Sequence, residues 1–295
     1  MDQAEVVDQK TGVVPGAGAG KASGPNNLRV RIVTALILAP LVLLLLFYGP
    51  AWGWALFIAL SAGQVGGEML AMTHPTDRVS RLVGAFMSFG ICLLSYASAG
   101  DLRLFLTGIF CVLIVGAMLP LLRLGQIQTA ALRMLGGISA PLYVGVLMST
   151  LTLLRRDPGD AGPRYVLFTL FVAWTADTGG YAAGRMFGRT KLYEAVSPKK
   201  TREGLAGSVV MAVLVSVVGS LTYIRQISPY AAALLGAVGA VLGQMGDLVE
   251  SLLKRSTGVK DSGAILPGHG GLFDRVDALL IVGPLVYVYY LWFSH

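Results

Sequence analysis

Long apolar stretches alternate with short polar connections along most of this chain. Nine of the stretches approach the roughly 20 apolar residues that a helix needs to cross a bilayer. They are residues 32–49, 51–71, 82–99, 104–122, 134–154, 164–184, 204–224, 230–250 and 275–293. The pattern predicts an all-α, polytopic membrane bundle of about nine transmembrane helices. Residues 1–27 lack the pattern and are rich in Gly and Ala, so we expect a disordered tail ahead of a membrane-embedded domain at 28–295.

Composition and charge favour a membrane protein. Of the 295 residues, 55% are hydrophobic and 13% are charged, about half the charge of a soluble domain. Most Lys and Arg residues fall in the tail and the even-numbered loops, which places the N-terminus in the cytoplasm by the positive-inside rule. This bias shrinks when the two most basic loops are set aside. We assign the net charge of +7 to topology and an anionic substrate, and we expect no nucleic acid partner.

Four acids interrupt the apolar stretches: Glu68, Asp177, Asp247 and Glu250. A charge near the bilayer centre costs roughly 3 kcal/mol on insertion scales, so each acid is expected to face a polar cavity, a partner or the interface. For Glu68, a snorkelling side chain or an ion pair with a neighbouring arginine (Arg78 or Arg81) explains the residue as well as a functional role does.

The last connection of the chain is its most polar one. Asp247, Glu250 and Ser251 precede it at positions i, i+3 and i+4, so they share one helix face. Asp274 and Asp277 repeat the i, i+3 spacing where the final span begins. Paired carboxylates on two helix ends suit a hard cation such as Mg²⁺, which is typically held by one or two carboxylates plus substrate phosphates. Ordinary salt bridges are the alternative explanation.

Two further segments have the composition of anion sites. The turn at residues 267–271 places three glycines around His269, which lets backbone N–H groups approach a phosphate; an idle loop histidine is the alternative. Asp177 and Tyr181 share a helix face ahead of a basic connection that contains Ser197–Thr201. Lys, Arg, Ser and Thr at this density predict a polyphosphate site. Ordinary positive-inside charge is the competing explanation.

At these residues the sequence resembles the phosphatidate cytidylyltransferases, also called CDP-diacylglycerol synthases. The family signature S-x-x-K-R-x4-K-D-x-G-x3-P-G-H-G-G-x-x-D-R-x-D is matched at every fixed position from Ser251 to Asp277. Further matches are residues 246–251, 177–179 and 197–201. Arg202 stands where the family usually has Trp. The resemblance covers the C-terminal half; the N-terminal half matches only in its span pattern and in having Glu68.

The resemblance implies that a cytidylyl group passes from CTP to phosphatidic acid and that pyrophosphate is released. It implies an active site on the cytoplasmic face of a bacterial-type inner membrane, and a homodimer surrounded by membrane lipids. It also implies dependence on Mg²⁺, with K⁺ as an occasional companion ion, and metal ligation by Asp247 and Asp274. Glu250 and Asp277 would support these ligands.

Together, the chemistry and the resemblance assign expected roles to two groups of residues. The expected catalytic groups are Asp247, Asp274, Lys254, Arg255, Lys260, His269, Arg275 and Asp277. The expected substrate-binding groups are Ser197, Lys199, Lys200, Thr201, Ser251, Asp261, Gly268, Gly270, Gly271, Asp177 and Tyr181.

Two other functions fit parts of the pattern. A CTP-dependent kinase of the prenol or dolichol type would transfer the γ-phosphoryl group to a lipid alcohol, with Asp277 or His269 as general base. Cytidine label would enter the lipid only in the cytidylyl transfer. An ion- or proton-coupled transporter would use Glu68, Asp177 and Asp247 as a relay. Against the transporter, the polar residues gather at one face and trace no path across the membrane.

Overall fold

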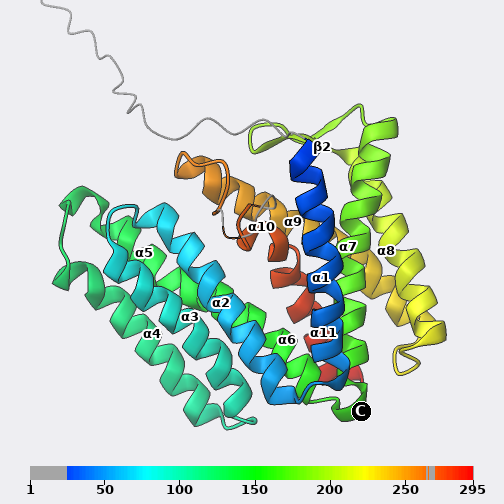
Figure 1. The fold of residues 1–295 in the computed structure, drawn as a ribbon, viewed down its shortest axis with the longest axis horizontal. Coiled ribbons are helices and arrows are strands. Elements are labelled where there is room, and N and C mark those ends of the chain that lie inside the picture. Colours follow the sequence, from blue (N-terminus) through cyan, green and yellow to red (C-terminus); the bar gives the residue numbers. More distant parts are fainter. Residues whose placement is uncertain (1–24, 264, 266–269, 295) are drawn as a thin grey trace, which may run out of the picture.

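The computed structural model describes residues 25–263, 265 and 270–294, which form a bundle of long helices (Figure 1). The helices are α1 (Pro25–Tyr48), α2 (Ala51–Thr73), α3 (Arg78–Ala97), α4 (Leu102–Leu122), α5 (Ala130–Ala140), α6 (Leu147–Arg156), α7 (Gly162–Phe187), α8 (Arg202–Thr222), α9 (Pro229–Ser256), α10 (Phe273–Val276) and α11 (Leu279–Phe293). A two-stranded hairpin, β1 (Lys191–Tyr193) and β2 (Ser197–Thr201), is the one sheet in this part of the chain. The predicted all-α class is confirmed.

Each of the nine predicted spans coincides with a helix or with helices in direct succession. The fifth runs through α5, a π-helical turn at Pro141–Val146 and α6, and the ninth runs through α10 and α11. Pro141 accounts for the wider turn, because proline offers no N–H to the helix ladder. Short 3₁₀ turns at Ile127–Thr129 and Gly159–Ala161 precede α5 and α7.

Seven helical segments in the described residues are long and apolar enough to cross a membrane, so the chain is an integral membrane protein. They are Ala51–Thr73, Arg78–Ala97, Leu102–Leu122, Ile127–Arg156, Arg202–Thr222, Pro229–Ser256 and Phe273–Phe293. Helix α7 is long enough to cross a membrane, but it is too polar to be among these seven. In α1, the apolar part is the shorter segment Leu36–Tyr48.

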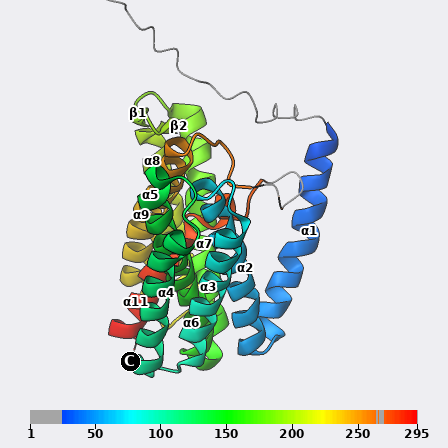
Figure 2. The same cartoon turned by 90° about the vertical axis from the view of Figure 1, so that its left-hand side faces the viewer.

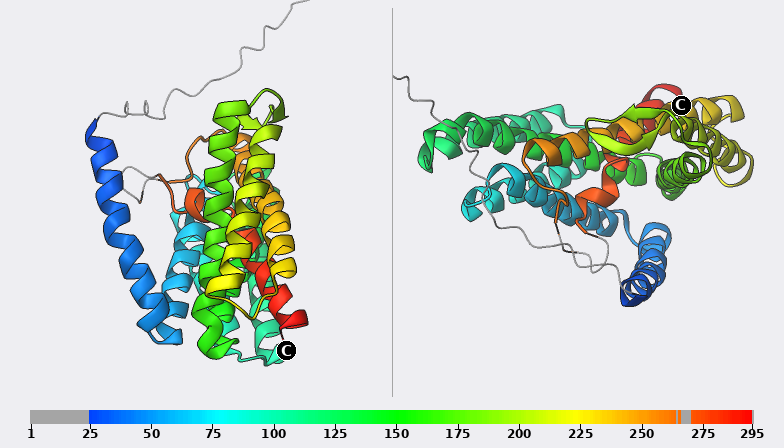
Figure 3. Two further views of the ribbon diagram at one scale, coloured as in Figure 1. Left: turned by 90° about the vertical axis from the view of Figure 1, so that its right-hand side faces the viewer. Right: turned by 90° about the horizontal axis from the view of Figure 1, so that it is seen from above.

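Helix α1 begins at Pro25, inside the last residues of the predicted tail, and residues 1–24 lie outside the described residues. It stands apart from the other helices over most of its length (Figures 2 and 3). Its C-terminal end is tied down by Arg155 of α6. The Nε of Arg155 donates to the carbonyl oxygen of Leu46 at 2.9 Å, and its Nη2 donates to that of Gly49 at 3.1 Å.

The bundle has two sides with the C-terminal helices between them (Figure 1). Helices α2 to α5 form one side, α7 and α8 form the other, and α9 and α10 lie in the middle; α10 contacts α2, and α9 contacts both α7 and α8. Large buried side chains fill the core, among them Trp54, Tyr165, Phe168 and Phe273. The indole N–H of Trp54 donates to the carbonyl oxygen of Leu151 at 3.0 Å, which ties α2 to α6.

The hairpin was not predicted, and it gives the basic connection a fixed shape at the end of the bundle opposite the C-terminus (Figure 1). Its strands are antiparallel, with Lys191 opposite Thr201. Thr201 also caps α8, because its Oγ1 accepts from the N–H of Gly204 at 3.1 Å. The carboxylate of Glu203 accepts from the N–H groups of Arg189 and Thr190 at 3.1–3.2 Å. These contacts fasten the hairpin to the first turn of α8.

Close glycine packing joins α7 to α8, and we expect Gly179→Ala to weaken it. A Cβ on Gly179 would lie 2.5 Å from the carbonyl oxygen of Gly207 and 2.7 Å from the Cβ of Met211. Overpacking of this kind costs about 1–3 kcal/mol, so the unfolding midpoint of the purified protein in detergent should fall. Gly90→Ala in α3 is the matched control, because a Cβ there meets no atom within 4 Å. Equal midpoints for Gly179→Ala and wild type would contradict the packing.

Candidate active site

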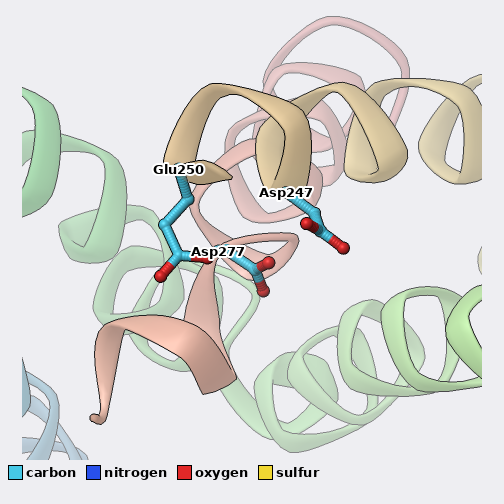
Figure 4. Close-up of side chains that lie close together, drawn as sticks. All are labelled: Asp247, Glu250 and Asp277. Carbon is cyan, nitrogen blue, oxygen red and sulfur yellow. The ribbon is translucent and has the colours of Figure 1, made fainter. Parts of the chain in front are cut away.

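Three carboxylates meet in the middle of the bundle. Asp247 and Glu250 lie one turn apart on α9, and Asp277 lies directly after α10 (Figure 4). One carboxylate oxygen from each lies within 4.8 Å of the others. Glu250 is 2% exposed, and its Oε1 has no hydrogen-bond partner within the described residues. Oxygen ligands at this spacing around an unpaired buried carboxylate oxygen suit a divalent cation.

A lysine from the hairpin reaches this acid cluster from the α8 side. The Nζ of Lys200 lies 2.7 Å from Oδ2 of Asp247 and donates to the carbonyl oxygen of Gln244 at 3.3 Å. The Oγ of Ser251 donates to the other carboxylate oxygen of Asp247 at 3.3 Å. The basic segment expected to bind polyphosphate therefore contacts the helix expected to bind metal.

Asp274, the second expected metal ligand, lies outside the acid cluster. Its Oδ1 is 2.6 Å from the Nζ of Lys254, which also lies 3.0 Å from Oε2 of Glu250. Its Oδ2 accepts from the N–H and Oγ of Ser262, at 3.3 and 2.8 Å, and from the N–H of Gly271 at 3.2 Å. Asp274 thus holds the connection between α9 and α10, and it is joined to the cluster both through Lys254 and by a direct side-chain hydrogen bond with Glu250.

Glu68 is a second anchor of the same connection. It is 6% exposed, and it accepts from the N–H groups of Leu272 and Phe273 at 3.1 and 2.8 Å and from the Oγ of Ser262 at 3.3 Å. Gln64 donates to it from α2 at 3.0 Å. Within the described residues it forms no ion pair with either neighbouring arginine. The sequence analysis did not predict this role. The signal available in the sequence was that the residues four positions before and after Glu68 on α2 are not basic, so neither can form an ion pair with it.

A cavity of about 410 Å³ lies between α7, α8, α9 and the hairpin. Its lining includes five of the expected substrate-binding residues, namely Asp177, Tyr181, Lys199, Lys200 and Thr201, and the expected metal ligand Asp247. Two more polar residues line it that were not among the expected groups. The Nη1 of Arg185 donates to the hydroxyl of Tyr181 at 2.8 Å, and the Nε2 of Gln244 donates to Oδ1 of Asp177 at 3.4 Å.

The other expected residues belong to neither the acid cluster nor the cavity lining, or they lie outside the residues that the structure describes. Arg255, Lys260, Asp261 and Arg275 are exposed, and Ser197 lies on β2 but does not line the cavity. Gly270 has a φ of 82°, a conformation that favours glycine. A Cβ on Gly271 would lie 1.9 Å from the Oγ of Ser262, so a side chain there would displace the connection. Gly268 and His269 lie outside the described residues.

Known proteins resemble this chain over its whole helical region or over about half of it. Residues 29–293 match the model of a family described as the cytidylyltransferase family. A phosphatidate cytidylyltransferase of Staphylococcus epidermidis is 44% identical over 144 residues, which cover 49% of this chain and 54% of the relative. That of Bacillus subtilis is 39% identical over 155 residues, 52% of this chain and 57% of the relative. The phosphatidate cytidylyltransferase of Staphylococcus aureus is 42% identical over 146 residues, which cover 49% of this chain and 54% of the relative. The chain thus spans about half the length of the relatives it matches.

Proposed function

This chain belongs to the cytidylyltransferase family, and we propose that it transfers the cytidylyl group of CTP to phosphatidic acid, giving CDP-diacylglycerol and pyrophosphate. The observation that carries the proposal is the 2.7 Å contact between Lys200 and Asp247. This contact puts a cavity lined by cationic side chains, suited to a triphosphate, beside a cluster of three carboxylates. Two polyanions can meet only where such groups neutralise their charge.

In the proposed reaction an oxygen of the lipid phosphate attacks the α-phosphorus of CTP. A new P–O bond forms, the bond from the α-phosphorus to the oxygen that bridges to the β-phosphate breaks, and pyrophosphate leaves with that electron pair. A phosphate monoester has a second pKa of about 6 and is largely dianionic at neutral pH, so the attack needs no strong general base. The contribution of Arg185, Lys199 and Lys200 would be to position the triphosphate and neutralise its charge.

We propose that Asp247, Glu250 and Asp277 hold Mg²⁺. Their carboxylate oxygens lie within 4.8 Å of one another, and the buried Oε1 of Glu250 lacks a partner within the described residues. When bound, the ion would supply Lewis-acid charge neutralisation at the phosphates. Lys254 would keep Asp274 beside this cluster, through its contacts of 2.6 and 3.0 Å with Asp274 and Glu250. K⁺ as a companion ion and assembly as a homodimer are further expectations from the family resemblance.

We place the site at the cytoplasmic face of a bacterial-type inner membrane. The hairpin, with Lys191, Lys199 and Lys200, lies at the same end of the bundle as the N-terminus of α1 (Figure 1). Basic residues concentrate on the cytoplasmic side of membrane proteins. A site at that end would be open to CTP from the cytoplasm while the acyl chains of the lipid stay in the bilayer.

Labelled CTP tests the proposed reaction. The purified full chain is incubated in detergent with phosphatidic acid, Mg²⁺ and CTP labelled either in cytidine or in the γ-phosphate. We expect cytidine label in the lipid extract and an equal amount of pyrophosphate. Entry of the γ-phosphate into a lipid alcohol without cytidine would identify a kinase instead. If neither label reached a lipid, the proposal would be refuted.

We expect Lys200→Gln to lower kcat/KM for CTP roughly 10- to 100-fold, because a hydrogen bond to a charged group contributes about 1.5–3 kcal/mol. Steady-state kinetics with CTP as the varied substrate measures the effect. Lys191→Gln is the matched control: it lies on the same hairpin, does not line the cavity, and donates to the carbonyl oxygen of Pro198 at 2.5 Å. Equal losses in both variants would mean that general hairpin charge matters, and not the position of Lys200.

A further inference from the structure

A second hollow, of about 740 Å³, lies between α2 and α3 and shares no lining residue with the cavity at Lys200. Its walls are the α2 face from Leu60 to Ala71 and the α3 face from Arg78 to Phe89, and Ser262 and Gly263 lie at one end. We call it the α2–α3 groove. The function proposed above gives it no role, because the proposed triphosphate site is lined by other residues.

Two arginines form the charged part of the groove. Arg78 is the first residue of α3, and Arg81 follows one turn later. Neither forms an ion pair with an acid in the part of the chain that the structure describes. Glu68 also lines the groove, but its oxygens accept from Ser262, Leu272 and other donors. The groove thus offers two guanidinium groups, the side chains best shaped for phosphate.

The rest of the α3 wall is apolar and open. Leu82 and Phe86 follow Arg78 at successive i+4 positions, so all three share one helix face. Leu82 is 70% exposed and Phe86 is 72% exposed, and Leu60 on the facing wall is 59% exposed. In a membrane-spanning chain this surface continues from the arginines toward the bilayer interior. Cations at one end and apolar surface along the length match a phosphate monoester that carries acyl chains.

A short row of side chains connects the groove to the acid cluster. The Oγ of Ser262, at one end of the groove, shares its single hydrogen between Asp274 at 2.8 Å and Glu68 at 3.3 Å. Asp274 contacts Lys254, and Lys254 contacts Glu250 of the cluster. The groove is therefore linked to the carboxylates that the cationic cavity also borders at Asp247, so two substrates could meet at this cluster.

We propose that the α2–α3 groove binds the lipid substrate, with Arg78 and Arg81 on its phosphate monoester and the acyl chains along Leu82 and Phe86. The cavity at Lys200 is then left to the triphosphate. This assignment rests on the proposed function, because it needs a lipid phosphate as one of the two substrates.

Substrate-resolved kinetics tests the assignment in the purified full chain. Arg78→Gln and Arg81→Gln should each raise KM for phosphatidic acid about tenfold, the low end of what a charged hydrogen bond contributes. KM for CTP should stay within twofold. Arg103→Gln is the matched control, because Arg103 is an exposed arginine at the start of α4 and lies outside the groove. An unchanged lipid KM in both groove variants, or a raised KM for CTP instead, would overturn the assignment.

Direct binding separates this inference from the proposed reaction. Fluorescent phosphatidic acid is titrated into wild type and the double variant Arg78→Gln/Arg81→Gln without CTP, with phosphatidylcholine and glycerol 3-phosphate as competitors. We expect tight, arginine-dependent binding that neither competitor displaces, since one lacks the monoester and the other the acyl chains. Arginine-dependent binding without cytidylyl transfer would sink the proposed function but keep the groove as a lipid site. Normal transfer with arginine-independent binding would sink the groove alone.

Discussion

Asp247→Asn should abolish turnover, with kcat lowered by at least about 10³-fold. The side chain keeps its size and its contact with Ser251, but it loses the charge that faces both the acid cluster and Lys200. Metal-supplied charge stabilisation is worth several kcal/mol, and each 1.36 kcal/mol is a factor of ten in rate. Substantial cytidylyl transfer by the purified Asp247→Asn protein would refute its assignment as a metal ligand.

The same assay distinguishes the two acids at the start of the last span. If Asp277 holds the cation, Asp277→Asn should raise the Mg²⁺ concentration for half-maximal activity by 10-fold or more, since loss of metal-site partners costs roughly 10- to 100-fold in affinity or activity. Asp274→Asn should lower kcat with little change in the Mg²⁺ requirement, because Asp274 contacts Lys254 and Ser262. The opposite result would favour the pair of Asp247 and Asp274 expected from the sequence.

Asp101→Asn is the matched control for these substitutions. Asp101 caps α4 by accepting from the N–H of Arg103 at 2.9 Å, and it belongs neither to the acid cluster nor to the lining of the cationic cavity. Asparagine caps helices about as well as aspartate does, so activity and Mg²⁺ dependence should both match wild type. Chelation with EDTA should stop the wild-type reaction, and added Mg²⁺ should restore it.

The helices could be predicted because their signal is local. Most spans are apolar runs bounded by polar residues, and the bilayer fixes the length that each run must have. The hairpin could not be predicted in this way. Its strands are short and polar, and its position depends on contacts such as that between Glu203 and Thr190, which the composition of the segment does not reveal.

The site could be predicted only in part, for a related reason. Spacing indicated that Asp247 and Glu250 share a face, and they do lie together in the cluster. Spacing could not decide whether Asp274 or Asp277 faces these two acids. Acids one turn apart lie on the same side of a helix and differ only in their position along its axis. Spacing also could not place Glu68, because its backbone partners, the N–H groups of Leu272 and Phe273, lie more than 200 positions along the chain.

Glu68→Gln should lower kcat about 100-fold without unfolding the bundle. The carboxylate accepts from Leu272, Phe273 and Ser262, and thereby fixes the entry to α10 that carries Asp274 and Asp277. An amide offers one acceptor oxygen, and its NH₂ group would face donors. Hydrogen bonds to charged groups are worth about 1.5–3 kcal/mol each, so losing two should displace the connection and the acids beyond it. Cytidylyl transfer and the thermal unfolding midpoint are measured on the same preparation.

Proteolysis gives the second measurement for Glu68. Lys260 is exposed in the connection that Glu68 holds, so trypsin should cut there faster in Glu68→Gln than in wild type. Ser61→Ala is the control, because Ser61 lies on α2 outside the groove and donates to the carbonyl oxygen of Phe57 at 2.9 Å; it should keep most of the activity and the wild-type cleavage rate. If Glu68 served instead as an ion-pair partner of Arg78, then Arg78→Gln would reproduce the fast cleavage. Fast cleavage in both Glu68→Gln and Arg78→Gln would therefore contradict the anchoring role. Fast cleavage in Glu68→Gln alone would show that Glu68 holds the connection independently of the arginines in the α2–α3 groove.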